Sequence, residues 1–479
     1  MDSGLFRMHG FILAGALWLA FLPLDGALGQ TSDQTSGNHL KNQTSPYLRQ
    51  HAGDAINWYP WGEEAHARAR AEGKLIFLSI GYAACHWCHV QSRTTFTDKR
   101  VIKALNDHFI SILVDREERP DLDHHFIGVM LAMDGRSGWP ANFFLTPDAV
   151  PLFASGYLSP DPEYGDPGFV EIVQSLITEW SQNRDSILEN AERIRLQIAE
   201  MAAPVAFGRA TGLKDPRATA TATWAAKFDD EYGGFGAESK VLRPNVLSLL
   251  LHYGVMTRDE ALLTSVYNTL DHMAAGGVRD QLGGAFHRYS VDRFWQVPHF
   301  EIMLNENALL ARLYLEAFQA SGKPRYAFVA RAILDDLLAR FRLPGGGFAS
   351  SLNAESEEKE GLYYTWTAQE IRAVLGDEAA EPFLSAYVDS SHGLVKGRSV
   401  LRLMVRPESL LATQKDLKES LLQLRRARAK RTPPSRDDKV LTSWNALAIS
   451  AFAKAAQILG DKKYLAVARE EMSRLLALS

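Results

Sequence analysis

Short apolar runs alternate with helical segments over the first two hundred residues. Residues 74–80, 110–114 and 142–146 are apolar runs of strand length. Residues 62–73 are charged and alanine-rich, which favours a helix, and Asp98 is a suitable N-cap for another. A turn after the third run leads into a hairpin. Strands that alternate with helices in this way predict an α/β fold.

Helical periodicity dominates the second half of the chain. Residues 202–217 contain two prolines and two glycines but few large apolar side chains, which is typical of a linker. Helical spacing then recurs at residues 246–256, 259–275, 301–320, 326–341, 444–459 and 463–478. Glycine-rich stretches separate these segments at intervals of about 45–65 residues. Repeated helical hairpins predict an α/α toroid, with a simple α-solenoid as the alternative.

The first thirty residues differ from the rest of the chain. Arg7 precedes an apolar run at residues 11–24, and residues 27–29 form a small-residue cleavage pattern. These features predict a cleaved signal peptide over residues 1–29 and a flexible leader over residues 30–37. A disordered tail and an uncleaved anchor are the alternatives. The signal peptide predicts a periplasmic or secreted protein without a stable membrane anchor.

Composition narrows the class of partner. The 479 residues are enough for two or three domains, and 46% hydrophobic with 23% charged residues is ordinary for a globular protein. The formal net charge is -5, with acids and bases interspersed. We therefore expect no nucleic-acid partner and no polybasic attraction to anionic membranes.

The two cysteines of the chain are Cys85 and Cys88. A pair this close closes almost no loop, so its crosslink adds little stability and its value must be chemical. Cys85 follows a predicted strand and begins a predicted helix, where free N–H groups and the helix dipole favour a thiolate. His86 adds positive charge when protonated, and Cys88 is placed to resolve a mixed disulfide. The motif predicts a redox-active site in a thioredoxin-like domain.

A proline supports this interpretation. Pro140 follows Trp139 just before the third predicted strand, where thioredoxin folds place a cis-proline facing the cysteines. An ordinary trans proline is the alternative. Trp139 and Pro140, together with His86 and Trp87, form the predicted supporting residues of the redox site.

Two other kinds of site compete for the cysteine motif. Cys85 to His89 also satisfy Cys-x-x-Cys-His, the attachment pattern of c-type haem, but here a strand leads into the motif. A zinc site would need further ligands, for which His124 and His125 are the candidates. We expect no metal and no cofactor.

Longer motifs point to a family. In the N-terminal half they are Ser45-Pro46-Tyr47-Leu48, Trp58-Tyr59-Pro60-Trp61-Gly62, the cysteine motif, residues 114–121 and Gly138-Trp139-Pro140. In the helical half they are Gln281-Leu282-Gly283-Gly284, Phe286-His287-Arg288-Tyr289, Pro298-His299-Phe300-Glu301 and residues 437–445. Over residues 38–460 the chain resembles the spermatogenesis-associated protein 20 family. The resemblance implies a thioredoxin-like domain joined to an (α/α)6 toroid similar to six-hairpin glycosidases.

The pattern and the resemblance together set the expected domains. A thioredoxin-like domain is expected at residues 38–201, a linker at 202–217 and the toroid at 218–479. About ten helices are recognisable after the linker, whereas a closed toroid needs twelve, so we expect a truncated chain or an incomplete toroid. Where the family has an acid after the cysteines, this chain has gained Arg93, a cation that would favour a thiolate.

Carboxylates and aromatic residues of the helical half suit carbohydrate chemistry. Glycoside hydrolysis needs two carboxyl groups ~5–9.5 Å apart around one bond. The candidates are His287, Asp292, Trp295, His299, Glu301, Glu306, Glu355 and Asp437. The alternative is that these residues cap helices and satisfy loop backbones. A solvated loop is expected for three acids after the second predicted strand: Asp115, Glu117 and Glu118.

The sequence thus predicts an exported thiol–disulfide oxidoreductase in which Cys85 attacks and Cys88 resolves. Protein thiols or disulfides are the expected partners. A carbohydrate-active or carbohydrate-binding toroid with an accessory thioredoxin domain is the alternative function. A c-type haem protein is a more remote one.

Overall fold

The computed structural model describes residues 38–163, 165–202, 215–389 and 394–477. The predicted signal peptide and leader lie outside the described residues, as does most of the predicted linker. Residues from Asn38 onward form one compact unit. In the described residues, no helix is both long enough and apolar enough to cross a membrane.

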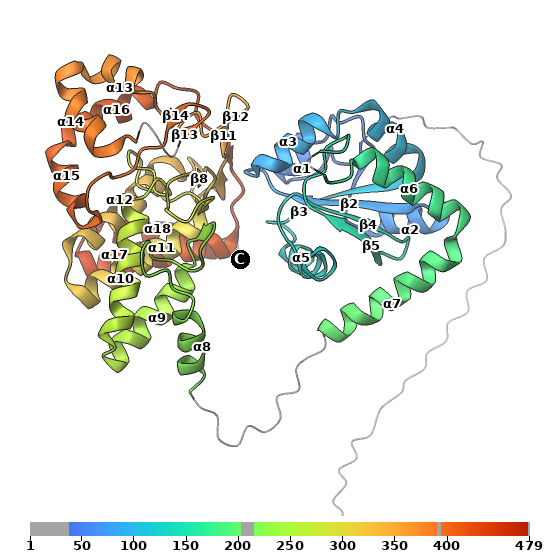
Figure 1. Cartoon of the computed structure of the whole chain (residues 1–479), viewed down its shortest axis with the longest axis horizontal. Helices are drawn as coiled ribbons and strands as arrows, with labels where there is room; N and C mark the ends of the chain where they lie inside the picture. Colours follow the sequence, from blue (N-terminus) through green and yellow to red (C-terminus); the bar gives the residue numbers. More distant parts are fainter. Residues whose placement is uncertain (1–37, 164, 203–214, 390–393, 478–479) are drawn as a thin grey trace, which may run out of the picture. The chain divides into compact units, whose positions relative to one another are not determined.

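A five-stranded sheet organises the N-terminal part (Figure 1). Its strands are β1 (Trp58–Pro60), β2 (Leu75–Gly81), β3 (Phe109–Asp115), β4 (Ala141–Leu145) and β5 (Pro151–Ser155). Their order is β1-β3-β2-β4-β5. β3 runs parallel to β1 and β2, whereas β4 is antiparallel to β2 and β5 is antiparallel to β4. The three predicted strands are confirmed as β2, β3 and β4.

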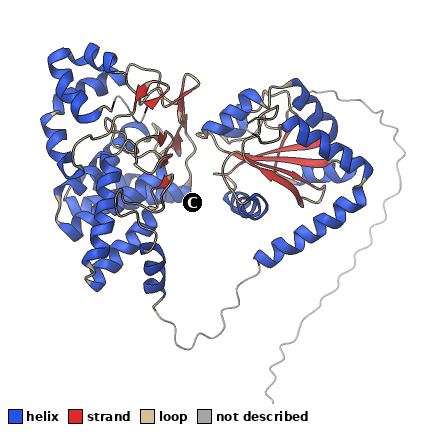
Figure 2. Ribbon diagram, in the orientation of Figure 1, coloured by secondary structure: helices blue, strands red, loops and turns tan. Residues whose placement is uncertain are grey.

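Helices cover both faces of this sheet (Figure 2). They are α1 (Pro46–Gln50), α2 (Glu63–Glu72), α3 (His86–Thr94), α4 (Lys99–His108), α5 (Pro120–Asp134), α6 (Phe169–Gln182) and α7 (Arg184–Ala202). Alternate residues of β2 enter different cores. Phe77 packs with residues of α3, α4 and α6, whereas Ile76 and Leu78 pack with residues of α2 and α5. Every residue of β2 and β3 is buried, as expected for central strands covered on both sides.

The rest of the chain is mainly helical. Its α-helices are α8 (Pro216–Ala225), α9 (Pro244–Thr257), α10 (Glu260–Ala275), α11 (Leu304–Ser321), α12 (Pro324–Arg340), α13 (Ala368–Leu375), α14 (Asp377–Tyr387), α15 (Leu410–Asp416), α16 (Lys418–Arg428), α17 (Thr442–Leu459) and α18 (Lys462–Ala477). Successive helices pack in pairs such as α9 with α10, α11 with α12 and α17 with α18. They enclose one apolar core. The predicted fold class is confirmed: a thioredoxin-like α/β domain precedes a helical, toroid-like half.

Short strands line the loops of the helical half. They are β6 (Lys240–Val241), β7 (Tyr289–Ser290), β8 (Pro298–His299), β9 (Ile302–Met303), β10 (Ser351–Leu352), β11 (Glu355–Ser356), β12 (Lys359–Glu360), β13 (Leu394–Val395), β14 (Arg398–Ser399) and β15 (Arg436–Asp437). β10 pairs with both β9 and β15, so the loops that follow α10, α12 and α16 are tied together. These loops carry the residues of the helical half that meet the cysteine motif.

Candidate redox site

The cysteine motif begins helix α3. β2 ends at Gly81, and after a short turn Cys85 is the N-cap of α3, as the sequence predicts. The backbone N–H of Cys88 donates to Cys85 Sγ at 3.2 Å. The two cysteines form a disulfide with their Cα atoms 5.3 Å apart. This placement gives Cys85 the free N–H groups and positive dipole end that stabilise a thiolate.

The disulfide is covered, while the residue between the cysteines is not. Cys85 and Cys88 are only 2% and 3% exposed, whereas Trp87 is 45% exposed. The Trp87 ring lies 5.2 Å from that of Tyr157, centroid to centroid. Of these three residues of the motif, Trp87 rather than either cysteine is therefore the one accessible to solvent.

Pro140 precedes the strand next to β2. Its peptide bond with Trp139 is cis, as predicted. The Trp139 indole N–H donates to Asp123 Oδ1 at 2.7 Å, and the Arg116 guanidinium lies 4.0 Å from the centre of the indole ring. These contacts hold Trp139 in a defined position beside the motif, because both a hydrogen bond and a cation–π contact fix its ring.

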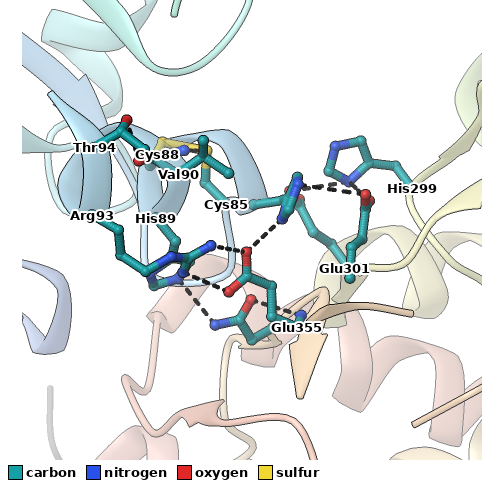
Figure 3. A network of polar contacts seen from close by, with 12 residues as sticks. Cys85, Cys88, His89, Val90, Arg93, Thr94, His299, Glu301 and Glu355 are labelled. Carbon is teal, nitrogen blue, oxygen red and sulfur yellow. Dashed lines mark hydrogen bonds and ion pairs between the residues drawn. A yellow bond between two sulfur atoms is a disulfide. The ribbon is translucent and has the colours of Figure 1, made fainter. Parts of the chain in front are cut away.

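Glu355 of the helical half contacts the cysteine helix directly (Figure 3). Glu355 Oε1 lies 2.5 Å from His86 Nδ1, and Arg93 donates to both carboxylate oxygens, at 2.8 and 3.0 Å. A second carboxylate, Glu360, lies 3.5 Å from His86 Nε2. Burial alone would raise the pKa of Glu355, but hydrogen bonds from His86 and Arg93 outweigh it and lower this pKa to about 2. Glu355 is therefore a carboxylate across the physiological pH range.

Further contacts tie the motif to the same loops. The Ala354 N–H donates to the Ala84 carbonyl at 3.4 Å, next to Cys85. Asn353 Nδ2 lies 3.0 Å from His89 Nε2, which also contacts the Ala83 carbonyl at 2.8 Å. Burial lowers the pKa of His89, so its neutral form is favoured.

Tyr82, on the turn before the motif, contacts a second group of buried charged residues that belongs to the helical half. The Tyr82 hydroxyl donates to Glu301 Oε2 at 2.7 Å, and Arg288 Nη1 lies 3.4 Å from the same oxygen. His299 Nδ1 lies 3.6 Å from Glu301 Oε1. Burial raises the pKa of Glu306, whose Oε2 has no hydrogen-bond partner among the described residues. His299, Glu301 and Glu355 are thus brought together around the cysteine motif.

Two of the three acids predicted to lie in a solvated loop, Asp115 at the end of β3 and Glu117 just after it, are buried, so that expectation is wrong for them. Asp115 is 2% and Glu117 is 8% exposed, although Glu118 is exposed. Lys439 of the helical half forms ion pairs with Asp115, Glu117 and Asp437. The three acidic side chains thus share the positive charge of one buried lysine.

Three of the candidate toroid residues make contacts typical of a structural role and not of a catalytic one. Asp292 accepts hydrogen bonds from three backbone N–H groups of its own loop, and Trp295 is fully buried with its indole N–H donating to the Tyr232 carbonyl. His287 is buried, with Nδ1 at 3.0 Å from the Phe300 carbonyl. Burial lowers the pKa of His287 to about 4. In these three positions the structure favours the backbone and core role.

The surroundings of the motif do not fit a c-type haem. The histidine of the pattern would have to be an axial ligand, but His89 Nε2 lies 2.8 Å from the Ala83 carbonyl and 3.0 Å from Asn353 Nδ2. His124 and His125, the candidate zinc ligands, are exposed on α5. Among the described residues, no cluster of three or more His, Cys, Asp or Glu side chains could hold a metal ion.

A family model matches the N-terminal part of the chain, and curated relatives match most of its length. The family Thioredox_DsbH, described as a protein of unknown function, DUF255, matches residues 37–199. Spermatogenesis-associated protein 20 of Homo sapiens is 34% identical over 483 residues, which cover 92% of this chain and 61% of the human protein. The chain thus spans about three-fifths of the length of the curated relatives it matches.

Two solved structures resemble separate parts of the chain. A DsbH oxidoreductase is 20% identical with a TM-score of 0.21, and the match covers 28% of this chain and 91% of that one. A cellobiose 2-epimerase from Spirochaeta thermophila is 16% identical with a TM-score of 0.26, and the match covers 53% and 82%.

Proposed function

We propose that this chain, a relative of spermatogenesis-associated protein 20 that carries a Thioredox_DsbH domain, is a thiol–disulfide oxidoreductase acting on proteins. The observation that carries the proposal is the position of Cys85. It is the N-cap of a helix that directly follows a central strand, it is bonded to Cys88, and the chain has a cis-proline before the adjacent strand. No structural need explains a disulfide that closes so short a loop.

The exchange proceeds in two balanced steps. A thiolate of a substrate dithiol attacks Cys85 Sγ, the Cys85–Cys88 bond breaks, and Cys88 leaves as a thiolate that takes up a proton. The second substrate thiolate then attacks the mixed disulfide at the substrate sulfur and displaces Cys85. The substrate is oxidised to a disulfide by loss of two electrons, and the cysteine pair is reduced. The reverse sequence reduces a substrate disulfide.

A pocket beside Trp87 suits the chain of a protein substrate. It has a volume of about 490 Å³ and is lined by Trp87, Trp139 and residues 153–158 of the edge strand β5 and its loop. Apolar and aromatic walls with an adjacent strand edge can hold an extended peptide. The partner proposed here is therefore a polypeptide thiol or disulfide.

Export from the cytoplasm is part of the proposal. Disulfides persist in oxidising compartments, and residues 1–29 have the pattern of a signal peptide. Fractionation of the source cells, with mass determination of the mature N-terminus, tests it. Recovery in the cytoplasm with residues 1–29 intact would contradict export.

Disulfide exchange of the purified full chain tests the activity. We expect the wild-type chain to reduce or oxidise a model protein substrate, Cys85→Ser to abolish exchange, and Cys88→Ser to accumulate a mixed disulfide through Cys85. Val255→Ala, a change at an exposed position of α9, is the control and should exchange normally. Unchanged exchange by Cys85→Ser would refute the proposal.

A further inference from the structure

The side chains that can bring positive charge near the cysteines contact carboxylates of the helical half. His86 follows Cys85 directly and lies between two carboxylates, with Nδ1 at 2.5 Å from Glu355 and Nε2 at 3.5 Å from Glu360. Arg93, in the last turn of the same helix, makes a bidentate ion pair with Glu355. The charges expected to stabilise a Cys85 thiolate therefore face a partner carboxylate from another part of the chain.

A backbone contact joins the loop that carries Glu355 to the turn before Cys85. Ala354 donates to the carbonyl of Ala84, so the residues adjacent to Glu355 and to Cys85 are joined by a hydrogen bond. Glu355 is also buried, at 7% exposure, so solvent screens its charge only weakly. Figure 3 shows its carboxylate between His89, Arg93 and the start of α3.

A negative charge at this position changes the balance between the disulfide and the dithiol. Cations near the attacking cysteine stabilise its thiolate and make the pair more oxidising, as in oxidases whose reduced form is stabilised. A carboxylate that pairs with those cations opposes this effect. The other titratable groups facing His86 are Glu360 and, at a ring distance of 6.1 Å, His299.

Resting on the proposed oxidoreductase function, we infer that Glu355 is a positioning residue by which the helical half sets the redox balance of the cysteine pair. It holds His86 and Arg93 in ion pairs, withholds their charge from Cys85, and so favours the disulfide over the dithiol. The reaction class is unchanged, but the strength of the pair as an oxidant is set by a residue 270 positions from Cys85 in sequence.

Equilibration of the full chain with reduced and oxidised glutathione tests this inference. Glu355→Gln keeps the size and one acceptor oxygen but removes the charge. We expect the equilibrium to shift about tenfold toward the dithiol, which corresponds to about 30 mV. The pH at which Cys85 of the reduced chain reacts half-maximally with iodoacetamide should fall as well. Glu360→Gln, at the longer distance from His86, is the matched control and should shift the equilibrium less.

A second substitution separates charge from loosened packing. Arg93→Gln should shift the equilibrium toward the disulfide, and the double variant Arg93→Gln/Glu355→Gln should return close to wild type. A double variant that behaves like Glu355→Gln alone would overturn the inference, as would an unchanged equilibrium in Glu355→Gln. Failure of the wild-type pair to equilibrate with glutathione at all would instead overturn the proposed function.

Discussion

The Tyr82 hydroxyl donates a 2.7 Å hydrogen bond to Glu301 Oε2 across 219 residues of sequence. Tyr82 is 3% and Glu301 is 2% exposed, so the bond is made without competing water. Burial raises the pKa of Tyr82 well above its usual value, which keeps the phenol a donor. This one bond joins the turn before Cys85 to the loop between β8 and β9.

Removing that donor should destabilise the chain. Tyr82→Phe leaves a buried carboxylate with Arg288 at 3.4 Å as its remaining charged partner there, and we expect a loss of ~1–3 kcal/mol in the free energy of unfolding. Denaturant unfolding of the full chain measures it. Tyr157→Phe removes a weaker hydroxyl contact, at 3.4 Å from Thr94, and should change stability by less than ~0.5 kcal/mol. Equal losses in the free energy of unfolding for the two substitutions would show that the hydrogen bond to Glu301 does not contribute more to stability than the weak Tyr157 contact.

Gly81 is the point where the strand, Tyr47 and the resolving cysteine approach one another. A Cβ at this position would overlap the Tyr47 hydroxyl and lie 2.9 Å from Cys88 Sγ. Both neighbours are buried, at 2% and 3% exposure, so neither can move away freely. Because Gly81 has no side chain, both the Tyr47 hydroxyl and Cys88 Sγ can approach its backbone closely.

Gly81→Ala should lower stability and disturb the cysteine pair together. We expect a loss of ~1–3 kcal/mol from overpacking, with faster reduction of the disulfide by dithiothreitol because the new Cβ displaces Cys88 from its buried position. Gly128→Ala is the control, because a Cβ there meets nothing within 4 Å and alanine favours a helix by about 1 kcal/mol over glycine. If Gly81→Ala folds with wild-type stability and reduction kinetics, the close approach is not restrictive.

The local structure of the redox site could be predicted because its signals are local. The apolar run that forms β2, the cysteine spacing and the proline before β4 all act within a few residues of the elements they specify. The family resemblance predicts the same fold, and the 34% identity to the human relative confirms that resemblance. Short-range patterning was thus sufficient for the strand, the helix and the cis-proline.

The partners of that site could not be predicted because tertiary packing brings them together. His86 and Glu355 are 269 residues apart, and nothing in the spacing of either segment indicates that they meet. Arg93 was expected to favour a thiolate, but a carboxylate from the helical half pairs with it. The sequence likewise predicts a solvated loop for Asp115 and Glu117, because their partner Lys439 is 324 residues from Asp115. Whether a charged residue is buried or solvated cannot be predicted from the sequence until the residue that carries its counter-charge is known.

Glu117 should make stability depend on pH near neutrality. It shares one lysine with Asp115 and Asp437, and neither of its oxygens has a hydrogen bond among the described residues. Burial, with repulsion from the neighbouring carboxylates, raises the pKa of Glu117 to about 7 despite the attraction of Lys439. Because the folded state then holds a proton that the unfolded state releases near pH 4.5, the contribution of this group is fully favourable below that pH. It is lost as pH rises toward 7.

Glu117→Gln should therefore stabilise the chain at alkaline pH and have little effect in acid. The amide cannot ionise, while Lys439 keeps Asp115 and Asp437 as partners, so we expect a gain of about 3 kcal/mol at pH 8 relative to pH 4.5. Denaturant unfolding of wild type and variant across this pH range measures the difference. Glu118→Gln is the matched control at the next position, and because Glu118 is exposed its effect should be much smaller. A Glu117→Gln variant whose stability relative to wild type is the same at both pH values would mean that this carboxyl is ionised throughout, with Lys439 alone compensating all three acids.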